Sequence, residues 1–165
     1  ADQVEVLVNV DDRQKPVGQK RQELLEYSKA KWVCFLDDDD MPYPNYVQLI
    51  MDAIESDPEA DCIGTNGLMT VNGAGRLRWC HRLGWPTREK YNGFDYTRGI
   101  WHFSPVLRSK ALKAGFDKTL RYGEDADYAN RLNPLLTQEV NIEQPLFVYR
   151  YSNKVPHAIK YGLNK

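Results

Sequence analysis

Residues 32–44 read "WVCFLDDDDMPYP", an apolar run that passes directly into four consecutive carboxylates, Asp37 to Asp40. A short, continuous apolar run is typical of a strand that is buried on both faces of a sheet. Like charges repel one another, and burying an unpaired carboxylate is costly. The stretch therefore has two interpretations: the acids form a solvated turn after a buried strand, or a bound cation compensates their charge.

The residues before this stretch predict a strand followed by a helix. The segment "VEVLVNV" (Val4–Val10) alternates and is β-branched, as strands are, and it ends at Asp11 and Asp12. The segment "QKRQELLEYSKAK" (residues 19–31) has the apolar spacing of a helix. Together with a strand over residues 32–36, this order is a βαβ unit, which predicts parallel strands joined by a right-handed crossover.

This order of elements brings two groups of acids together. Asp11 and Asp12 end one predicted strand, and the run from Asp37 to Asp40 ends the next. Neighbouring parallel strands have their carboxyl ends at the same edge of the sheet, which is where open α/β sheets bind ligands. We therefore expect the two groups to lie close together in space.

The rest of the chain predicts further helices, strands and loops. A helix is expected between Asn45 and Pro58, and strands with turns at both Asn-Gly pairs are expected over residues 61–83. The polar, aromatic stretch 84–99 predicts a long loop of the kind that forms a lid or rim. The other expected elements are a strand over residues 100–107, a helix over 109–115 closed by Gly115, a helix over 124–132 and a strand over 146–151.

A second acidic cluster follows Gly123, where Glu124, Asp125 and Asp127 fall in the first turn of a predicted helix. Negative charge is favourable there because the first N–H groups of a helix are unpaired and the helix dipole is positive at that end. One acid is enough for this purpose. The second interpretation is that another of these acids faces a cleft and acts as a general base.

Length, charge and cysteine content exclude several classes of protein. The chain has 165 residues, which suits one domain, and its net charge of −1 gives no basic field for nucleic acid. No apolar run has the length of a membrane span, and the N-terminus lacks the layout of a signal peptide. Three widely spaced cysteines form no C-x-x-C pair. Reduced thiols and a cytoplasmic location are therefore expected.

Four motifs in order resemble those of inverting glycosyltransferases of family 2, which have the GT-A fold. They are "VEVLVNVDD", "WVCFLDDDDMPYPNYV", "GFDKTLRYGEDADYANRL" and "LFVYRY", and they span the chain from Val4 to about Arg150. The resemblance implies an α/β fold with one GT-A-like (Rossmann-like) domain over residues 1–150. Its central sheet would be mainly parallel and flanked by helices, with a small antiparallel addition, and residues 151–165 would form a tail that closes over the metal site.

The resemblance also implies a nucleotide-sugar donor held by a divalent cation, Mn²⁺ or Mg²⁺. The expected donor is a UDP-sugar such as UDP-glucose. Asp39 is then the direct metal ligand, Asp37 contacts the ribose or a metal-bound water, and Asp38 belongs to the donor pocket. His157, which follows the last strand, is expected to complete the metal shell. Oxygen ligands of this kind suit hard cations.

Further residues are expected around the donor. The resemblance implies that Asp11 or Asp12 accepts a hydrogen bond from the uracil ring. Arg21 lies between the acidic clusters in sequence and is expected to balance diphosphate charge, or else to lie on a solvated helix face. Trp101 is a candidate for stacking on a sugar ring or for the core, and Trp85 is a second stacking candidate.

For the transfer step, the resemblance implies that Asp125 is the base. It would take the proton of an acceptor hydroxyl, on a sugar or another molecule, as that oxygen attacks the anomeric carbon in line. Inversion follows from a single displacement. Glu124 would orient Asp125 or bind the acceptor.

The chain also departs from the family pattern. It starts at what resembles the second strand of the family, and the family's serine after the first acid pair is absent from "DDRQKP". Two other functions therefore stay open: a non-catalytic, metal-dependent module that binds nucleotides or sugars, and a phosphatase of the haloacid-dehalogenase type. The phosphatase pattern expects Thr or Val where Met41 stands.

Overall fold

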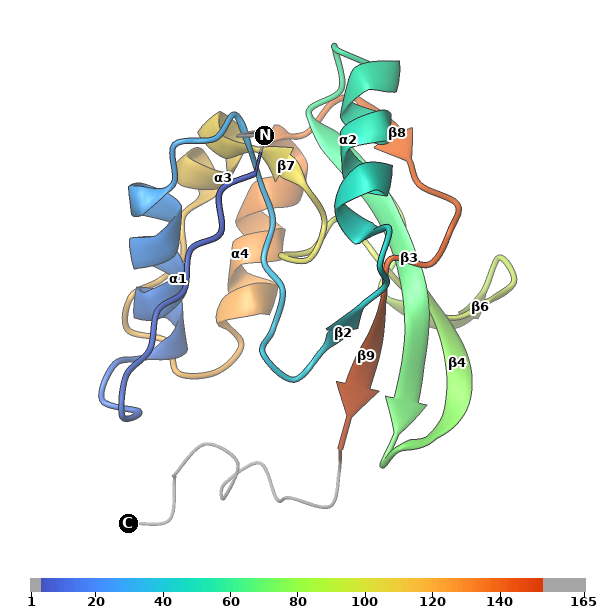
Figure 1. Cartoon of the computed structure of the whole chain (residues 1–165), viewed down its shortest axis with the longest axis horizontal. Helices are drawn as coiled ribbons and strands as arrows, with labels where there is room; N and C mark the ends of the chain where they lie inside the picture. The colour runs from blue at the N-terminus through green and yellow to red at the C-terminus, as the bar shows by residue number, and fades with distance from the viewer. Residues whose placement is uncertain (1–3, 153–165) are drawn as a thin grey trace.

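A mixed sheet runs through the molecule, with helices on both sides of it (Figure 1). The computed structural model describes residues 4–152. The helices are α1 (Val17–Tyr27), α2 (Tyr46–Ser56), α3 (Arg108–Ala114), α4 (Glu124–Leu132) and the 3₁₀ turn η1 (Asn133–Leu135). The strands are β1 (Trp32–Val33), β2 (Met41–Pro42), β3 (Cys62–Val71), β4 (Ala74–His81), β5 (Arg88–Tyr91), β6 (Phe94–Arg98), β7 (Val106–Leu107), β8 (Glu139–Asn141) and β9 (Phe147–Tyr151).

The sheet is mostly antiparallel, so the expectation of a mainly parallel sheet is wrong. The strand order is β1-β7-β3-β4-β6-β5, with β8 and β9 also paired to β3 and β2 paired to β9. Within residues 4–152, the parallel pairs are β3–β8, β3–β9 and β4–β6, and the other pairs are antiparallel. The long strand β3 turns back at once into β4, and such hairpins force neighbouring strands to be antiparallel.

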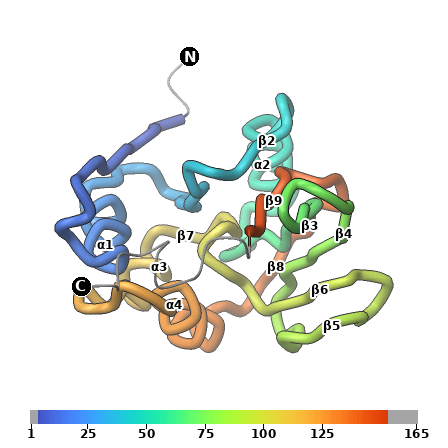
Figure 2. The backbone as a smooth tube through the Cα atoms, turned by 90° about the horizontal axis from the view of Figure 1, so that it is seen from below, coloured from blue at the N-terminus to red at the C-terminus, as the bar shows by residue number. Residues whose placement is uncertain are grey.

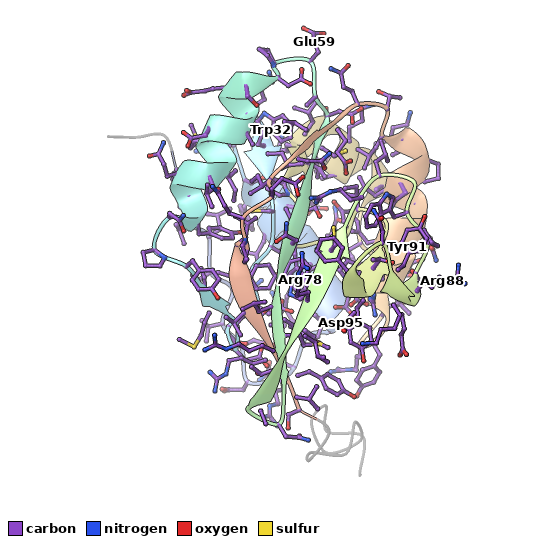
Figure 3. All side chains as sticks on the ribbon, turned by 90° about the vertical axis from the view of Figure 1, so that its right-hand side faces the viewer. Trp32, Glu59, Arg78, Arg88, Tyr91 and Asp95 are labelled. Atoms are coloured by element: carbon purple, nitrogen blue, oxygen red, sulfur yellow. The ribbon has the colours of Figure 1, made fainter. Side chains whose placement is uncertain are left out.

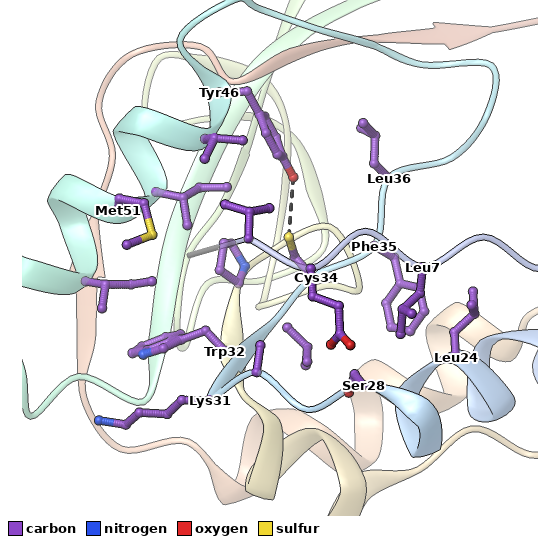
Figure 4. Close-up of a pocket in the computed structure, with 18 of the residues that line it drawn as sticks. Leu7, Leu24, Ser28, Lys31, Trp32, Cys34, Phe35, Leu36, Tyr46 and Met51 are labelled. Carbon is purple, nitrogen blue, oxygen red and sulfur yellow. Dashed lines mark hydrogen bonds between the residues drawn. The ribbon is translucent and has the colours of Figure 1, made fainter. Parts of the chain in front are cut away.

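The predicted strand over residues 4–10 is also wrong, although the segment is extended. It runs beside α1, and no strand within residues 4–152 pairs with it (Figure 1). An apolar groove of about 480 Å³ lies between this segment, which contributes Leu7, and residues 32–36, so the two backbones form no ladder (Figure 4). Val6 and Val8 consequently face solvent, with exposed fractions of 80% and 77%.

Of the predicted βαβ unit, the helix and a shortened second strand are therefore present. Helix α1 is confirmed, and it begins at Val17, directly after Pro16, because proline cannot donate a backbone hydrogen bond but suits a helix start. The strand predicted over residues 32–36 is shortened to β1, which pairs with β7 through Val33 and Val106. Beyond β1, the extended chain continues, and the N–H of Phe35 donates to the carbonyl of His102.

One of the two predicted Asn-Gly turns is confirmed and the other is wrong. Asn72 and Gly73 have positive φ angles and join β3 to β4. Asn66 and Gly67 instead lie within β3, where the side chain of buried Asn66 donates to backbone carbonyls. Gly67 pairs with Trp79 across the hairpin, and a Cβ atom there would collide with the Trp79 ring. Close approach, and not a turn, is the reason for this glycine.

We expect Gly67→Ala to destabilise the fold by about 1–3 kcal/mol because overpacking displaces its neighbours. Its Cβ would also lie 2.5 Å from the carbonyl oxygen of Phe147, which is backbone and moves little. Urea unfolding measures the change. Trp79→Leu removes one of the two clashes, so the double variant should lose less stability than the two single losses added together. Strict additivity would contradict this account.

The stretch predicted as a loop over residues 84–99 contains a hairpin, so that prediction is wrong for much of its length. Strands β5 and β6 pair antiparallel, and Asn92 and Gly93 form their turn with φ angles of 47° and 80°. Positive φ at both turn positions is typical of the two-residue hairpin. Figure 3 shows this hairpin in front of β4, with Arg88 and Tyr91 on β5 and Asp95 on β6.

Other local predictions are confirmed. Helix α2 has Asn45 at its N-cap position and ends before Pro58, α3 ends at Gly115 with φ of 61°, and α4 has the predicted bounds. Strand β9 is present, and the strand predicted over 100–107 is limited to β7. Strands β2 and β8 were not expected; both are very short and depend on partners distant in sequence.

The core has two parts, one on each side of the central strands. The first lies between α1, α3 and α4 and contains the large buried side chains of Leu25, Phe116, Tyr128 and Leu132. The second lies between α2 and the sheet strands. Its fully or largely buried residues include Ile63, Trp79, Phe103, Leu146 and Phe147. No helix within residues 4–152 is long and apolar enough to cross a membrane.

Asp61 joins the start of β3 to the chain that enters β8. It is buried, and it accepts hydrogen bonds from the N–H and hydroxyl of Thr137 and from the N–H of Gln138, with Lys110 Nζ 3.3 Å away. Burial raises the pKa of this carboxyl, but these donors outweigh burial, and the pKa lies below its ordinary value.

We expect Asp61→Asn to cost about 1–3 kcal/mol at pH 7 because the amide nitrogen would face donors. A carboxyl whose pKa is lowered by folding stabilises the protein above its unfolded pKa of about 3.9, and this contribution is lost as the pH falls through the lower folded value. The free energy of unfolding, measured with urea, should therefore differ less between Asp61→Asn and the wild type below about pH 4 than at pH 7. Asp52→Asn, on the exposed face of α2, is the control and should change little. If Asp61→Asn lowers the free energy of unfolding equally at pH 7 and at pH 3, the stabilising role of the ionised Asp61 carboxylate is contradicted.

Candidate functional site

The four consecutive aspartates form a turn in which the side chains differ in burial. The N–H of Asp40 donates to the carbonyl of Asp37 over 3.1 Å and closes the turn. Asp40 is buried, and its carboxylate accepts a hydrogen bond from the N–H of Arg150 on β9. Asp38 and Asp39 are exposed. The run is thus partly a structural anchor through Asp40 and partly an exposed pair of acids.

Asp37 lies on the inner side of this turn, and Arg21 of α1 links it to α4. The guanidinium donates from Nη2 to Asp37 over 2.8 Å and from Nε to Glu124 over 3.3 Å. Its side chain is only 12% exposed. One cation thus connects the two acidic motifs, which are far apart in sequence. The alternative of a solvated helix face for Arg21 is wrong.

His102 lies beneath the same carboxylate. Its Nε2 is 3.6 Å from Oδ2 of Asp37, which is beyond hydrogen-bond distance, and the side chain is buried. Neither ring nitrogen has a hydrogen-bond partner within residues 4–152. The ring packs against Phe103, with centroids 3.9 Å apart. A single histidine carries no local sequence signal of its place, so the sequence does not predict this contact.

Asp125 and Glu124 occupy the first turn of α4, which begins after Gly123. Gly123 has φ of 68°, a left-handed conformation that favours glycine, and so permits the sharp entry into the helix. Glu124 is buried and faces Arg21, whereas Asp125 is half-buried and its Oδ1 accepts from the N–H of Ala126. The third acid, Asp127, pairs with Arg131 along the helix surface. Only two of the three acids therefore belong to the site.

The charges of the site perturb its pKa values in different directions. Burial raises the pKa of Asp37, but the Arg21 guanidinium that donates to it outweighs burial, and the pKa lies below its ordinary range. Burial raises the pKa of Glu124, and Arg21 offsets this only in part. Burial lowers the pKa of His102 to about 4, so its ring is neutral at pH 7. Two carboxylates, Asp37 and Glu124, thus share one guanidinium, which leaves negative charge in the site.

Asp11 and Asp12 lie at the other side of α1. Asp11 accepts hydrogen bonds from the N–H of Lys15 over 2.8 Å and from Nζ of Lys20 over 2.9 Å. These bonds lower its pKa to about 2. Asp12 is exposed. Lys20 and Arg21 are consecutive in α1, and consecutive residues of a helix do not face each other, so these two ion pairs do not show that the acids at 11 and at 37 lie close together.

Trp101 lies beside His102 in sequence but borders a different region. It is partly buried, the guanidinium of Arg98 lies 4.4 Å from its ring centre, and it shares a hollow with Trp85. The apolar groove beside residues 4–10 contains none of the predicted site residues that the structure describes. The predicted residues that the structure brings together are therefore Arg21, Asp37 and Glu124, with Asp125 on the same helix turn.

The aspartate turn carries the carboxylates that could hold a divalent cation. Asp37 and Asp39 are two positions apart in an exposed turn and offer hard oxygen donors. Within residues 4–152, no group of three or more His, Cys, Asp or Glu side chains is arranged to hold a metal ion. Mg²⁺ in phosphate-binding sites commonly takes one or two carboxylates and completes its shell with phosphate and water. The residues fit that mode. His157, the predicted third ligand, lies outside the described residues.

Comparisons with known proteins give one family match and several structural matches. A sequence model of the family described as "Glycosyl transferase family 2" matches residues 4–116. A search of curated proteins found no match. Solved structures of TarS from S. aureus are similar to the chain at low sequence identity, which shows the fold alone.

The structural matches cover most of this chain. TarS 1-349 in complex with UDP-GlcNAc aligns with a TM-score of 0.62 at 14% identity, covering 83% of this chain and 39% of that one. TarS 1-349 aligns with a TM-score of 0.58 at 14% identity, covering 82% of this chain and 40% of that one. TarS aligns with a TM-score of 0.58 at 12% identity, covering 83% of this chain and 25% of that one. The chain thus spans two-fifths or less of the length of these structures.

Proposed function

Because the chain belongs to glycosyl transferase family 2, we propose that it transfers a sugar from a UDP-sugar to a hydroxyl group, with inversion at the anomeric carbon. The observation that carries this proposal is the double ion pair of Arg21. It brings Asp37, from the aspartate turn, and Glu124, from the first turn of α4, onto one guanidinium. Donor-side and acceptor-side acids of the proposed reaction therefore meet at one place.

The donor side of the proposed site is the turn from Asp37 to Asp39. A divalent cation, Mn²⁺ or Mg²⁺, would be held by Asp39 with Asp37 beside it, and when bound it supplies charge neutralisation for the diphosphate leaving group. Arg21 holds Asp37 in place, and its second bond to Glu124 keeps α1 and α4 together. Asp38, Asp11 and Asp12 remain proposed contacts of the donor.

The acceptor side is the first turn of α4. Asp125 is proposed to accept the proton of the attacking hydroxyl, since it is half-buried and, unlike Glu124, takes no part in the Arg21 bridge. Glu124 fixes the start of the helix through Arg21 and so orients Asp125. A positioned general base contributes about 10²–10⁴-fold to a rate. The likeness to a TarS fragment crystallised with UDP-GlcNAc supports a UDP-linked donor for this fold, and UDP-glucose is the alternative donor.

The test is release of UDP from UDP-GlcNAc and from UDP-glucose with Mn²⁺, compared with the same reaction in EDTA. We expect metal-dependent UDP release from at least one donor, which includes slow transfer to water. The same protein is incubated with p-nitrophenyl phosphate. Release of p-nitrophenol without any UDP release would replace this proposal with a phosphatase. Metal-dependent UDP binding without release from either donor would indicate a binding module.

A further inference from the structure

A second hollow lies between the β5–β6 hairpin and the C-terminal end of α4. It has a volume of about 410 Å³, within the usual range of small-molecule sites. Figure 2 shows the hairpin and α4 along the same edge of the molecule. The residues that line the hollow are Leu83, Gly84, Trp85, Thr87, Gly99 and Trp101 on the hairpin side, and Ala129, Asn130, Asn133 and Pro134 on the helix side.

The wall of this hollow is held in place by Asn133. Its Oδ1 accepts from the N–H of Ile100 over 2.9 Å, and its Nδ2 donates to the carbonyl of Ile100 over 2.8 Å. A Cβ atom at Gly99 would lie 2.7 Å from this same Oδ1, so the close approach requires glycine there. The chain that carries Trp101 is therefore fixed against the end of α4 before any ligand binds.

The two tryptophans give the hollow its chemistry. Trp85 packs edge-to-face against Tyr91, with ring centroids 5.3 Å apart, and Trp101 lies under the guanidinium of Arg98 at 4.4 Å. Both indoles are thus supported from outside the hollow and partly exposed. Indole rings beside the side-chain amide of Asn130 combine apolar faces with hydrogen-bonding groups. A pyranose ring has matching parts, an apolar face of C–H groups and a rim of hydroxyls.

The position of the hollow relates it to the transfer site. Asp125, Ala129 and Asn133 are four residues apart and lie along one stripe of α4 and its continuation. At 1.5 Å per residue, Ala129 and Asn133 lie about 6 and 12 Å from Asp125 along the helix axis. The hollow that Ala129 and Asn133 line is therefore about one to two helix turns from Asp125 along α4.

We propose that this hollow binds a pyranose unit of the acceptor, so that the acceptor is an oligosaccharide or polysaccharide and not a lone monosaccharide. This inference rests on the proposed function for the identity of the acceptor. The binding of sugar in the hollow is a separate property that needs neither donor nor metal. Trp85 and Trp101 stack on the ring, and the unit bound there lies one or more units from the reacting hydroxyl.

The experiment measures binding of maltotetraose, cellotetraose and chitotetraose by saturation-transfer NMR and by quenching of tryptophan fluorescence, at millimolar concentration and without donor. Trp85→Ala removes one stacking ring. Asn130→Trp fills the hollow from the exposed face of α4 and leaves every residue on the hairpin side unchanged. Tyr96→Ala is the control, because it removes an exposed aromatic ring from the same hairpin outside the hollow.

We expect at least one tetraose to bind the wild type and Tyr96→Ala alike and to bind both other variants about tenfold more weakly. Binding of none of the three, equal binding in all variants, or a loss in Trp85→Ala alone would overturn the proposal. Release of UDP by the wild type is measured in parallel. If tetraose binding behaves as expected but no UDP is released, the proposed function fails and the sugar site stands. If UDP is released but no tetraose binds, the sugar site alone fails.

Discussion

Replacing Asp125 with asparagine is expected to lower the rate of UDP release by about 10²–10⁴-fold, because the amide cannot accept the proton of the attacking hydroxyl. Asparagine keeps the size of the side chain, and its oxygen can still accept from the N–H of Ala126. UDP affinity should therefore change little. The rate is measured by UDP release at saturating donor, and the affinity by titration with UDP.

A neighbouring acid provides the control for this prediction. Asp127 lies on the same helix but pairs with Arg131 at the surface, so Asp127→Asn should keep nearly the full rate. A loss of rate in both variants would indicate a general effect of charge at the helix start. An unchanged rate in Asp125→Asn would remove Asp125 from the role of base.

The largest effect on stability is expected for Arg21→Ala. The change leaves Asp37 and Glu124 without their shared cation, and Glu124 is buried. Removing one partner of a buried ion pair commonly costs about 3–5 kcal/mol, and because Asp37 is partly exposed we expect about 3 kcal/mol. Urea unfolding at pH 7 measures this loss. Arg21→Lys restores the charge but not both bonds and should lose less.

The adjacent residue gives a matched comparison. Lys20 also forms an ion pair, with Asp11, but that pair lies near the surface. Lys20→Ala should therefore cost about 1 kcal/mol or less. Equal losses for Arg21→Ala and Lys20→Ala would show that the link between the two acidic motifs contributes nothing beyond an ordinary surface pair.

Helices in this protein follow from local sequence features, whereas strands do not. Pro16 before α1 and Gly115 after α3 mark helix ends through their own backbone geometry, and such signals are readable from the chain. Residues 4–10 have every local feature of a strand, but a strand also needs a neighbour to pair with, and the apolar groove stands where that neighbour would lie. Pairing of this kind is a property of the whole fold.

The Asn-Gly turn signals also show that a local sequence feature does not determine a structure that depends on contacts with other strands. Asn92-Gly93 is a hairpin signal, and it predicts the turn that joins β5 to β6. Asn66-Gly67 is the same dipeptide, yet it lies inside β3 because the ring of Trp79 needs the space above Gly67. The dipeptide alone cannot distinguish these cases, since the second depends on a contact with another strand.

For the candidate site, the acidic motifs could be identified from the sequence because they are runs of one residue type after predicted elements. The link between them could not. Arg21 had been one of several basic residues on a helix, and only the packing of α1 against the turn and α4 selects it. His102 depends wholly on the fold, because it reaches Asp37 through a segment with no regular structure.

The central claim is that the turn from Asp37 to Asp39 binds the diphosphate of a UDP-sugar through a divalent cation. Isothermal titration calorimetry of UDP into the protein, with Mn²⁺ and then with EDTA, tests it most directly. The account predicts binding that requires Mn²⁺ in the wild type and is lost in Asp39→Ala. Binding of equal strength in EDTA, or no heat with Mn²⁺ at millimolar UDP, would contradict it.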